Sequence, residues 1–197
     1  SKYNAINTEL TTELAKKAKG DGVKQFVFVS SVAVYGDSSP IGVDKIMSED
    51  TDPIPDDICG KSKLQAGINL NKLDDDSFNV AIIRSPMVYG KTCKGNFTLL
   101  KKIALHSFIF PNIVNSRSVI SIDNLLNVIE NIVLDCKRGL FLPQDEEYFC
   151  TSEFVVSYRK SLGKKTYLTK IFNPFIKLIS KMIPSINKVF GNLRYKK

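Results

Sequence analysis

A run of apolar residues in the segment 24–36, KQFVFVSSVAVYG, is the feature that most constrains how this chain can fold. From Phe26 to Ser30 no polar residue alternates with the apolar ones, which is typical of a strand buried on both faces of a parallel sheet. Ligands of such sheets bind at the carboxyl ends of the strands. Ser30 and Ser31 stand at that end, so they are the first candidates for a functional site. A serine after a strand can equally begin a turn, and that interpretation stays open.

Two helices and a second strand are predicted around this run. Residues 4–19 carry apolar side chains at steps of four, on one face of a helix: Ile6, Leu10, Leu14 and Ala18. Residues 60–73 predict a helix whose inward side chains are Leu64, Ile68 and Leu73. The segment 79–84, NVAIIR, follows as another buried strand. Strand, helix and strand in this order predict a parallel pair joined by a right-handed crossover.

The rest of the chain predicts shorter elements. Residues 37–57 are rich in Asp, Pro and Ser, which favours an irregular loop. Helices are expected at 96–106, 123–136 and 152–162, and extended segments at 119–122, Phe141 and 148–150. The inward side chains of the helix at 123–136 would be Leu126, Ile129 and Val133. The fold class is therefore α/β.

Composition argues against several kinds of site and partner. The four cysteines are scattered without a C-x-x-C pair and there is one histidine, so neither a zinc site nor a disulfide framework is expected. The thiols would be reduced, as in a cytoplasm. Residues 164–197 hold nine of the 28 Lys and Arg and none of the 20 Asp and Glu, and the net charge of the whole chain is +8. The remaining residues, 1–163, are thus close to neutral, which argues against a nucleic-acid partner.

The basic end of the chain contains a second informative segment. From Ile171 to Ile183 apolar residues recur at helical spacing, and Asn173-Pro174 is suited to begin a helix that Pro184 would end. Three lysines flank the apolar face: Lys170, Lys177 and Lys181. Residues 170–183 therefore predict either a helix on the anionic inner face of a membrane or a helix that packs on the domain or on a further piece of it. No apolar run reaches the ~18 residues of a membrane span, and the start SKYNAINTEL predicts no signal peptide.

Three motifs now stand in order along the chain: SSVAVYG at 30–36, CGKSK at 59–63 and RSPMVYG at 84–90. In order and spacing they resemble the extended short-chain dehydrogenase/reductase family. Within it they are most similar to the NAD-dependent nucleotide-sugar epimerases and dehydratases, of the UDP-glucose and UDP-N-acetylglucosamine 4-epimerase type. The resemblance runs from about residue 3 to 193. Each motif alone is weak, but their order is specific.

The resemblance implies an architecture. The chain would form a partial Rossmann-like, doubly wound sheet that lacks its N-terminal glycine-rich half, with a small and mostly helical C-terminal substrate-domain portion. Residues 1–90 would be the C-terminal half of the NAD-binding domain, 91–163 the substrate-binding segments, and 164–197 a basic amphipathic tail.

The resemblance also implies the roles of the motif residues. To oxidise a sugar hydroxyl with NAD, the family uses a tyrosine as base, a lysine four residues later that lowers the tyrosine pKa and holds the cofactor ribose, and a serine that binds the reacting oxygen. By position, Ser31 matches the serine, Lys63 matches the lysine, and Cys59 replaces the tyrosine. Contacts to NAD are implied for Asn7, Ser30, Ser31, Lys63 and Pro86. Contacts to a UDP-sugar substrate are implied for Met87, Asn96 and Arg117. Taken alone, Lys63 would be a solvated helix residue and Arg117 a surface ion-pair partner.

Two departures from the family pattern bear on activity. The thiol of Cys59 is too short to reach the place of a phenol oxygen, and a general base contributes about 10²–10⁴ in rate. A nucleophilic role for Cys59 would need a histidine, and none is near it in sequence. No glycine-rich fingerprint lies between a predicted strand and helix of these 197 residues, which predicts poor NAD affinity.

These observations predict a nucleotide-sugar epimerase or dehydratase segment that is inactive alone or active only when completed by the missing half. The alternative is a non-catalytic sugar-nucleotide-binding or regulatory module with the same fold. Because a partial sheet leaves edges and faces uncovered, a homodimer is a further expectation.

Overall fold

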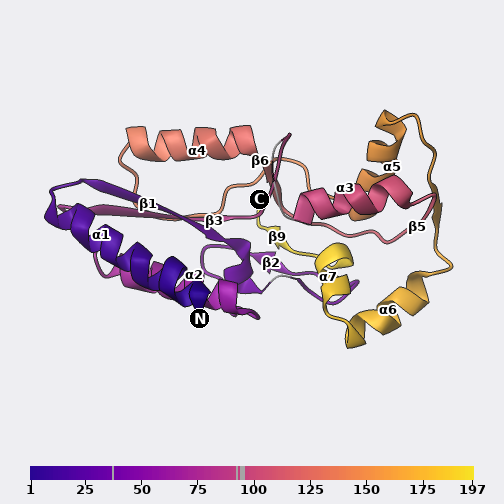
Figure 1. Ribbon diagram of the computed structural model, residues 1–197, viewed down its shortest axis with the longest axis horizontal. Coiled ribbons are helices and arrows are strands. Elements are labelled where there is room, and N and C mark those ends of the chain that lie inside the picture. Colours follow the sequence, from indigo (N-terminus) through magenta and orange to yellow (C-terminus); the bar gives the residue numbers. More distant parts are fainter. Residues whose placement is uncertain (37, 92, 94–95) are drawn as a thin grey trace. The chain divides into compact units, whose positions relative to one another are not determined.

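A computed structural model describes residues 1–36, 38–91, 93 and 96–197 (Figure 1). The chain forms two compact units whose segments alternate along the sequence. Unit 1 comprises Ser1–Asp37, Ser48–Pro86 and Ile120–Gln144, and unit 2 comprises Ser38–Met47, Met87–Val119 and Asp145–Lys197. The expected domain bounds 1–90, 91–163 and 164–197 stay a prediction.

Unit 1 is built on a parallel sheet. Strands β1 (Gln25–Ser31), β3 (Asn79–Ser85) and β7 (Gly139–Phe141) lie in the order β1-β3-β7, with both neighbouring pairs parallel. The register places Ser30 beside Arg84 and Ser31 beside Ser85. The predicted parallel pair, made from the segments 26–30 and 79–84, is confirmed.

Helices cover both faces of this sheet. The π-helix η1 (Asn4–Leu10) continues as α1 (Thr11–Gly20), the short 3-10 helix η2 (Val32–Tyr35) follows β1, and α2 (Ile58–Asn71) and α4 (Ile122–Leu134) are the crossover helices. Figure 1 shows α1 and α2 on one face and α4 on the other. The expected doubly wound α/β arrangement is therefore present in unit 1. Its core consists of Ala15, Leu70, Phe78, Val80 and Ile82.

The predicted inward faces of these helices are partly wrong. In η1 and α1 the buried side chains are Thr8 and Ala15, whereas three of the predicted ones are exposed: Ile6, Leu10 and Leu14. In α2, Ala66, Gly67 and Leu70 are buried and Ile68 is exposed. In α4, Leu125 and Ile132 are buried, whereas Leu126 and Val133 are exposed. In η1, α1 and α2 small buried side chains permit close approach of the helices, so the periodicity of large apolar residues indicated the wrong face. In α4 the buried face carries large residues, one position away from the predicted ones.

Unit 2 contains short strands and helices. The strands are β2 (Ile46–Met47), β4 (Met87–Tyr89), β5 (Ile109–Pro111), β8 (Tyr167–Thr169) and β9 (Arg194–Tyr195), with parallel pairs β2–β9 and β5–β8. The helices are α3 (Asn96–His106), α5 (Thr151–Ser161), α6 (Asn173–Met182) and α7 (Ser185–Phe190). Strand β6 (Val119–Ser121) begins in unit 2 and ends in unit 1. The helices expected at 96–106 and 152–162 are confirmed, and so is the mostly irregular segment 38–57.

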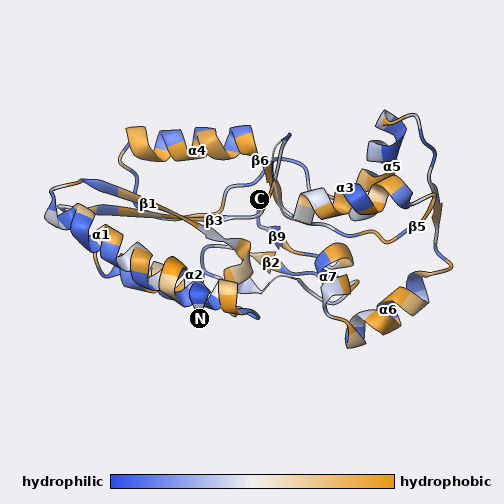
Figure 2. Ribbon diagram, in the orientation of Figure 1, coloured by the Kyte–Doolittle hydropathy of each residue, from blue (hydrophilic) through white to orange (hydrophobic). Residues whose placement is uncertain are grey.

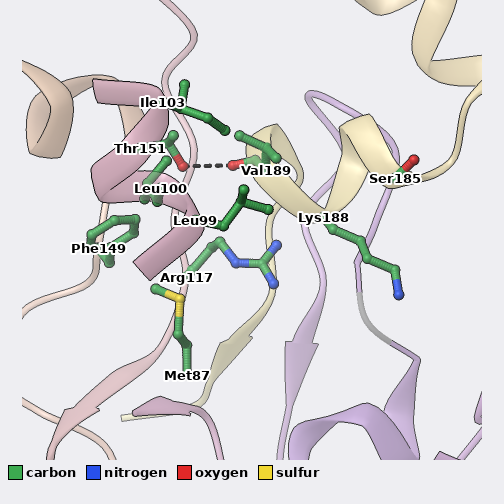
Figure 3. A pocket seen from close by; sticks show the side chains of 10 residues that line it. All are labelled: Met87, Leu99, Leu100, Ile103, Arg117, Phe149, Thr151, Ser185, Lys188 and Val189. Carbon is green, nitrogen blue, oxygen red and sulfur yellow. Dashed lines mark hydrogen bonds between the residues drawn. The ribbon is translucent and has the colours of Figure 1, made fainter. Parts of the chain in front are cut away.

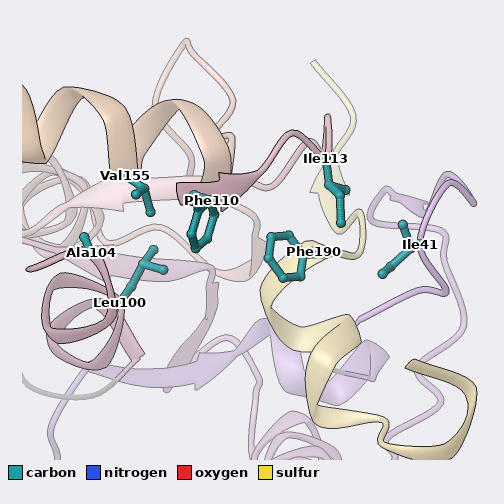
Figure 4. Close-up of a cluster of buried hydrophobic side chains, with 7 residues drawn as sticks. All are labelled: Ile41, Leu100, Ala104, Phe110, Ile113, Val155 and Phe190. Atoms are coloured by element: carbon teal, nitrogen blue, oxygen red, sulfur yellow. The ribbon is translucent and has the colours of Figure 1, made fainter. Parts of the chain in front are cut away.

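Aromatic and aliphatic side chains from most of these elements form the core of unit 2 (Figure 4). Leu100 and Ala104 come from α3, Phe110 from β5, Val155 from α5 and Phe190 from α7. The tail helix begins at Asn173-Pro174 and ends before Pro184, as predicted. Sequence patterns did not predict α7, because six residues after a proline carry too little periodicity. Among the described residues, no helix is both long and apolar enough to cross a membrane.

Candidate functional site

The carboxyl end of β1 is the first candidate site and lies in unit 1. Ser30 is buried, and Ser31 ends the strand with a half-buried side chain. The Ser31 hydroxyl accepts a hydrogen bond from the Ala33 amide (3.2 Å) and thereby caps η2. Ser31 thus begins a turn, and its own O–H can still donate to another acceptor.

Lys63 approaches this strand end from α2. Its Nζ donates a hydrogen bond to the carbonyl oxygen of Val29 (3.0 Å), two residues before Ser31. A small cavity of about 50 Å³ is lined by Lys63 together with Ser30 and Arg84. Burial lowers the pKa of Lys63, because desolvation disfavours the ammonium, and an electrostatic interaction with Cys59 opposes this shift. Lys63 is therefore not a freely solvated helix residue, although its contact with NAD stays a prediction.

Cys59 lies in the first turn of α2, directly after Ile58. Asp57 caps the helix, since its Oδ1 accepts a hydrogen bond from the Gly60 amide (2.7 Å). Cys59 and Lys63 stand one turn apart on the same face of α2, where side chains four residues apart are neighbours. The Cys59 thiol is free and half-buried. A cysteine thus occupies the position from which a longer side chain would extend beside the Lys63 ammonium.

Two further residues with a predicted NAD contact have visible structural partners. The Asn7 amide nitrogen donates to the Ser62 hydroxyl (3.0 Å), which holds η1 against α2. Pro86 is buried directly after β3, and its carbonyl oxygen accepts from the Ser85 hydroxyl (3.2 Å). Both lie in unit 1, and their contact with NAD stays a prediction.

Arg84 and Tyr35 form a pair that sequence reasoning missed. The Arg84 guanidinium lies over the Tyr35 ring, 4.7 Å from its centroid, and donates a hydrogen bond to the Tyr35 hydroxyl. Tyr35 is fully buried, and its hydroxyl donates to the carbonyl oxygen of Ser48 (3.4 Å). Both residues belong to the recognised motifs, but their meeting depends on the register of β1 and β3, which no local pattern specifies.

The other motif tyrosine, Tyr89, lacks the pKa that a catalytic base needs. Its hydroxyl donates to the Asp145 carboxylate (2.7 Å), and this hydrogen bond, with some desolvation, raises the pKa of Tyr89 to about 12. The phenol therefore stays protonated near neutral pH, whereas a catalytic base needs a pKa closer to the working pH.

A pocket in unit 2 is the second candidate site, with a volume of about 160 Å³ (Figure 3). One wall is apolar and comes from α3 through Leu99, Leu100 and Ile103. Arg117 and Lys188 bring two cationic side chains to its lining. Val189 of α7 lines the pocket as well, and its carbonyl oxygen accepts a hydrogen bond from the Thr151 hydroxyl (2.6 Å). The pocket thus combines an apolar wall with positive charge.

This pocket brings together two of the three predicted substrate residues. Met87 and Arg117, thirty positions apart in the sequence, both line it. Arg117 Nη1 donates to the Gly191 carbonyl oxygen (3.1 Å), and its backbone pairs with that of Phe149. The third residue, Asn96, begins α3, but its side chain lies outside the described part of the chain, as do Lys94 and Gly95. Lys188 was missed because α7, which carries it, was not predicted.

Comparison with known proteins gives a family match. Residues 1–109 match the model of the NAD dependent epimerase/dehydratase family. The chain is 36% identical over 171 residues to a UDP-glucose 4-epimerase of Vibrio cholerae, covering 84% of this chain and 52% of that protein. It is 29% identical over 174 residues to an N-acetyl-alpha-D-glucosaminyl-diphospho-ditrans,octacis-undecaprenol 4-epimerase of Escherichia coli O157:H7, covering 84% and 50%. The chain spans about half the length of these curated relatives.

A solved structure shares the fold. The UDP-glucuronic acid 4-epimerase of Bacillus cereus, in complex with NAD, superposes with a TM-score of 0.71 at 17% identity. The superposition covers 96% of this chain and 56% of the Bacillus protein.

Proposed function

Because the chain belongs to the NAD-dependent epimerase/dehydratase family, we propose that it is the part of an enzyme acting on nucleotide sugars that carries the strand-end site and binds the substrate. Such an enzyme oxidises a sugar hydroxyl transiently and returns the hydride with changed stereochemistry. The observation that carries the proposal is the position of Lys63, whose half-buried ammonium lies against the carboxyl end of β1. That is where parallel α/β sheets bind ligands.

The residues at this strand end suit the ribose end of NAD. Lys63 supplies a hydrogen-bond donor with a lowered pKa, and Ser30 and Ser31 add hydroxyl groups that both donate and accept. NAD, when bound, supplies the acceptor for the hydride. The chain would orient the cofactor ribose through Lys63 and the reacting sugar oxygen through Ser31.

Cys59 weakens the proton transfer in this proposal. A tyrosine at this position would extend its phenol beside Lys63, whose positive charge lowers the pKa of a neighbouring acid. The thiol of Cys59 is attached directly to Cβ and cannot extend as far. We therefore expect the chain to bind its ligands but to convert them slowly.

The pocket of unit 2 would hold the diphosphate of the substrate. The two curated relatives are named after sugar diphosphates. One name refers to UDP-glucose and the other to a diphospho-linked N-acetylglucosaminyl lipid. A guanidinium pairs with phosphate oxygens through two parallel hydrogen bonds, and Arg117 and Lys188 both line the pocket. We propose a UDP-sugar as the substrate class.

Titration with UDP-glucose tests this proposal. Lys188→Met is expected to weaken binding about tenfold or more, because a hydrogen bond to a charged group contributes about 1.5–3 kcal/mol. Lys188 is exposed, so the variant keeps the fold. Arg138→Met, which removes an exposed cation of unit 1, is the matched control and should bind as the parent does. Parent binding that Lys188→Met leaves unchanged would place the diphosphate elsewhere.

A non-catalytic sugar-nucleotide-binding or regulatory module is the second candidate function, and Cys59 is the residue that favours it. If the module is right, UDP-sugar binds but no turnover appears when Cys59→Tyr is combined with the glycine-rich N-terminal half of a relative.

We also propose a homodimer, since three exposed apolar residues form a stripe along η1 and α1: Ile6, Leu10 and Leu14. Sedimentation of Leu10→Ser beside the parent tests that association.

A further inference from the structure

Helix α6 has an inner face that holds it on unit 2. Ser180 is buried, and Ile176 packs against the hydrophobic core of the unit. The Asn173 amide nitrogen donates to the Asn112 carbonyl oxygen (2.8 Å), and Asn187 of α7 donates to the Ser180 carbonyl oxygen (3.2 Å). The orientation of the helix is thus determined by one face that combines Ile176 with the polar residues Asn173 and Ser180.

The outer face of α6 is apolar and exposed. Phe175, Leu178 and Met182 are 65%, 62% and 82% exposed. Ile171 and Phe172, just before the helix, are exposed as well. In Figure 2, hydrophobic residues of α6 alternate with hydrophilic ones along the helix. The residues 171, 175, 178 and 182 recur at intervals of three and four, so they form one continuous stripe.

Positive charge accompanies this stripe. Lys170, Lys177 and Lys181 are all exposed and are spaced to fall along one edge of it. No Asp or Glu occurs between 164 and 197. A helix with a large apolar face and a lysine-rich flank has the composition of helices that lie in the interface of an anionic membrane.

We propose that α6, with Ile171 and Phe172, binds the surface of an anionic membrane, its apolar stripe among the acyl chains and its lysines at the headgroups. The helix has ten residues, too few to span the ~30 Å hydrocarbon layer, so it would lie in the plane of the interface. Charge complementarity selects this occupant over pairing with the same tail of a second copy, because residues 164–197 of the copy would bring the same lysines and no acid. Since α6 is already folded with its stripe outward, binding requires no rearrangement of unit 2.

Flotation with lipid vesicles tests the proposal. The parent chain is expected to float with vesicles that contain phosphatidylglycerol and to stay behind with pure phosphatidylcholine vesicles. The triple variant Lys170→Gln, Lys177→Gln, Lys181→Gln should lower the partition coefficient on the order of a hundredfold, because each lysine near an anionic surface contributes about 1 kcal/mol. Phe175→Ser and Met182→Ser should each lower it on the order of tenfold.

The control is Leu134→Ser, which removes an apolar side chain that is 72% exposed on α4 and should leave flotation unchanged. Circular dichroism verifies that each variant is folded. Parent protein that fails to float, or floats equally with both vesicle types, overturns the proposal. So does self-association that Phe175→Ser abolishes in the absence of lipid, since the stripe would then be an interface between copies.

Discussion

At the scale of single residues, Lys63 and Arg84 show what local patterns reveal and what they miss. Lys63 could be singled out because the segment CGKSK at 59–63 matches a motif of the family that the sequence resembles, with Lys63 at the position of its lysine. Its hydrogen bond to Val29 and its burial come from the packing of α2 on β1, which spacing alone does not give. Arg84 meets Tyr35 only through the register of two strands, so no local signal could identify the pair.

The lowered pKa of Lys63 predicts how its substitution changes stability with pH. Above the lowered pKa and below the ordinary value of 10.5, the unfolded chain binds more protons at this residue than the folded chain does. The parent therefore gains stability as the pH rises through that window. Over the same window, the unfolding free energy of the parent should rise with pH relative to that of Lys63→Met. Urea titrations at several pH values measure it, and a difference independent of pH would contradict the burial of a charged Lys63.

At the scale of elements, the long and strongly patterned segments were predictable and the packed faces were not. The strands at 26–30 and 79–84 have apolar centres, and both form as expected. The predicted burial on both faces is wrong for the first strand, which is half-buried with Val29 exposed, whereas the centre of the second is buried. The inward faces of η1, α1 and α2 were misplaced because the small residues Thr8, Ala15 and Ala66 are the buried ones. In α4 large apolar residues are buried, but they are Leu125 and Ile132, each one position before a predicted residue. Small residues carry almost no periodic signal, although they decide where two helices can approach.

Two glycines of α2 give opposite expectations for the same substitution. A Cβ at Gly60 would clash with the carbonyl oxygen of Ala33 in η2. Gly60→Ala should therefore destabilise the protein by about 1–3 kcal/mol, as overpacking does. A Cβ at Gly67 would find only Ile82 Cδ1 at 3.5 Å, an ordinary contact. Gly67→Ala should be neutral or stabilise by up to about 1 kcal/mol, because alanine is the better helix former. Urea unfolding of both variants measures the contrast, and equal effects would mean that α2 does not lie against η2 as described.

At the scale of the whole molecule, the chain carries two candidate sites, one in each unit. The strand-end site in unit 1 holds Lys63 and the motif serines, and the pocket in unit 2 holds Arg117 and Met87. The family could be predicted from three short motifs because their order along the chain is specific. The membership of Lys188 in the unit 2 pocket could not, because it depends on how α7 packs.

The central claim is that this chain carries an epimerase-type site whose base has been replaced by Cys59. Its most direct test is the rate of C4 epimerisation of UDP-glucose by the chain completed with the glycine-rich N-terminal half of a relative, compared with the Cys59→Tyr variant in the same context. The claim predicts that Cys59→Tyr is faster by about 10²–10⁴-fold, the contribution of a general base. A Cys59 protein that turns over as fast as its Cys59→Tyr variant would contradict it.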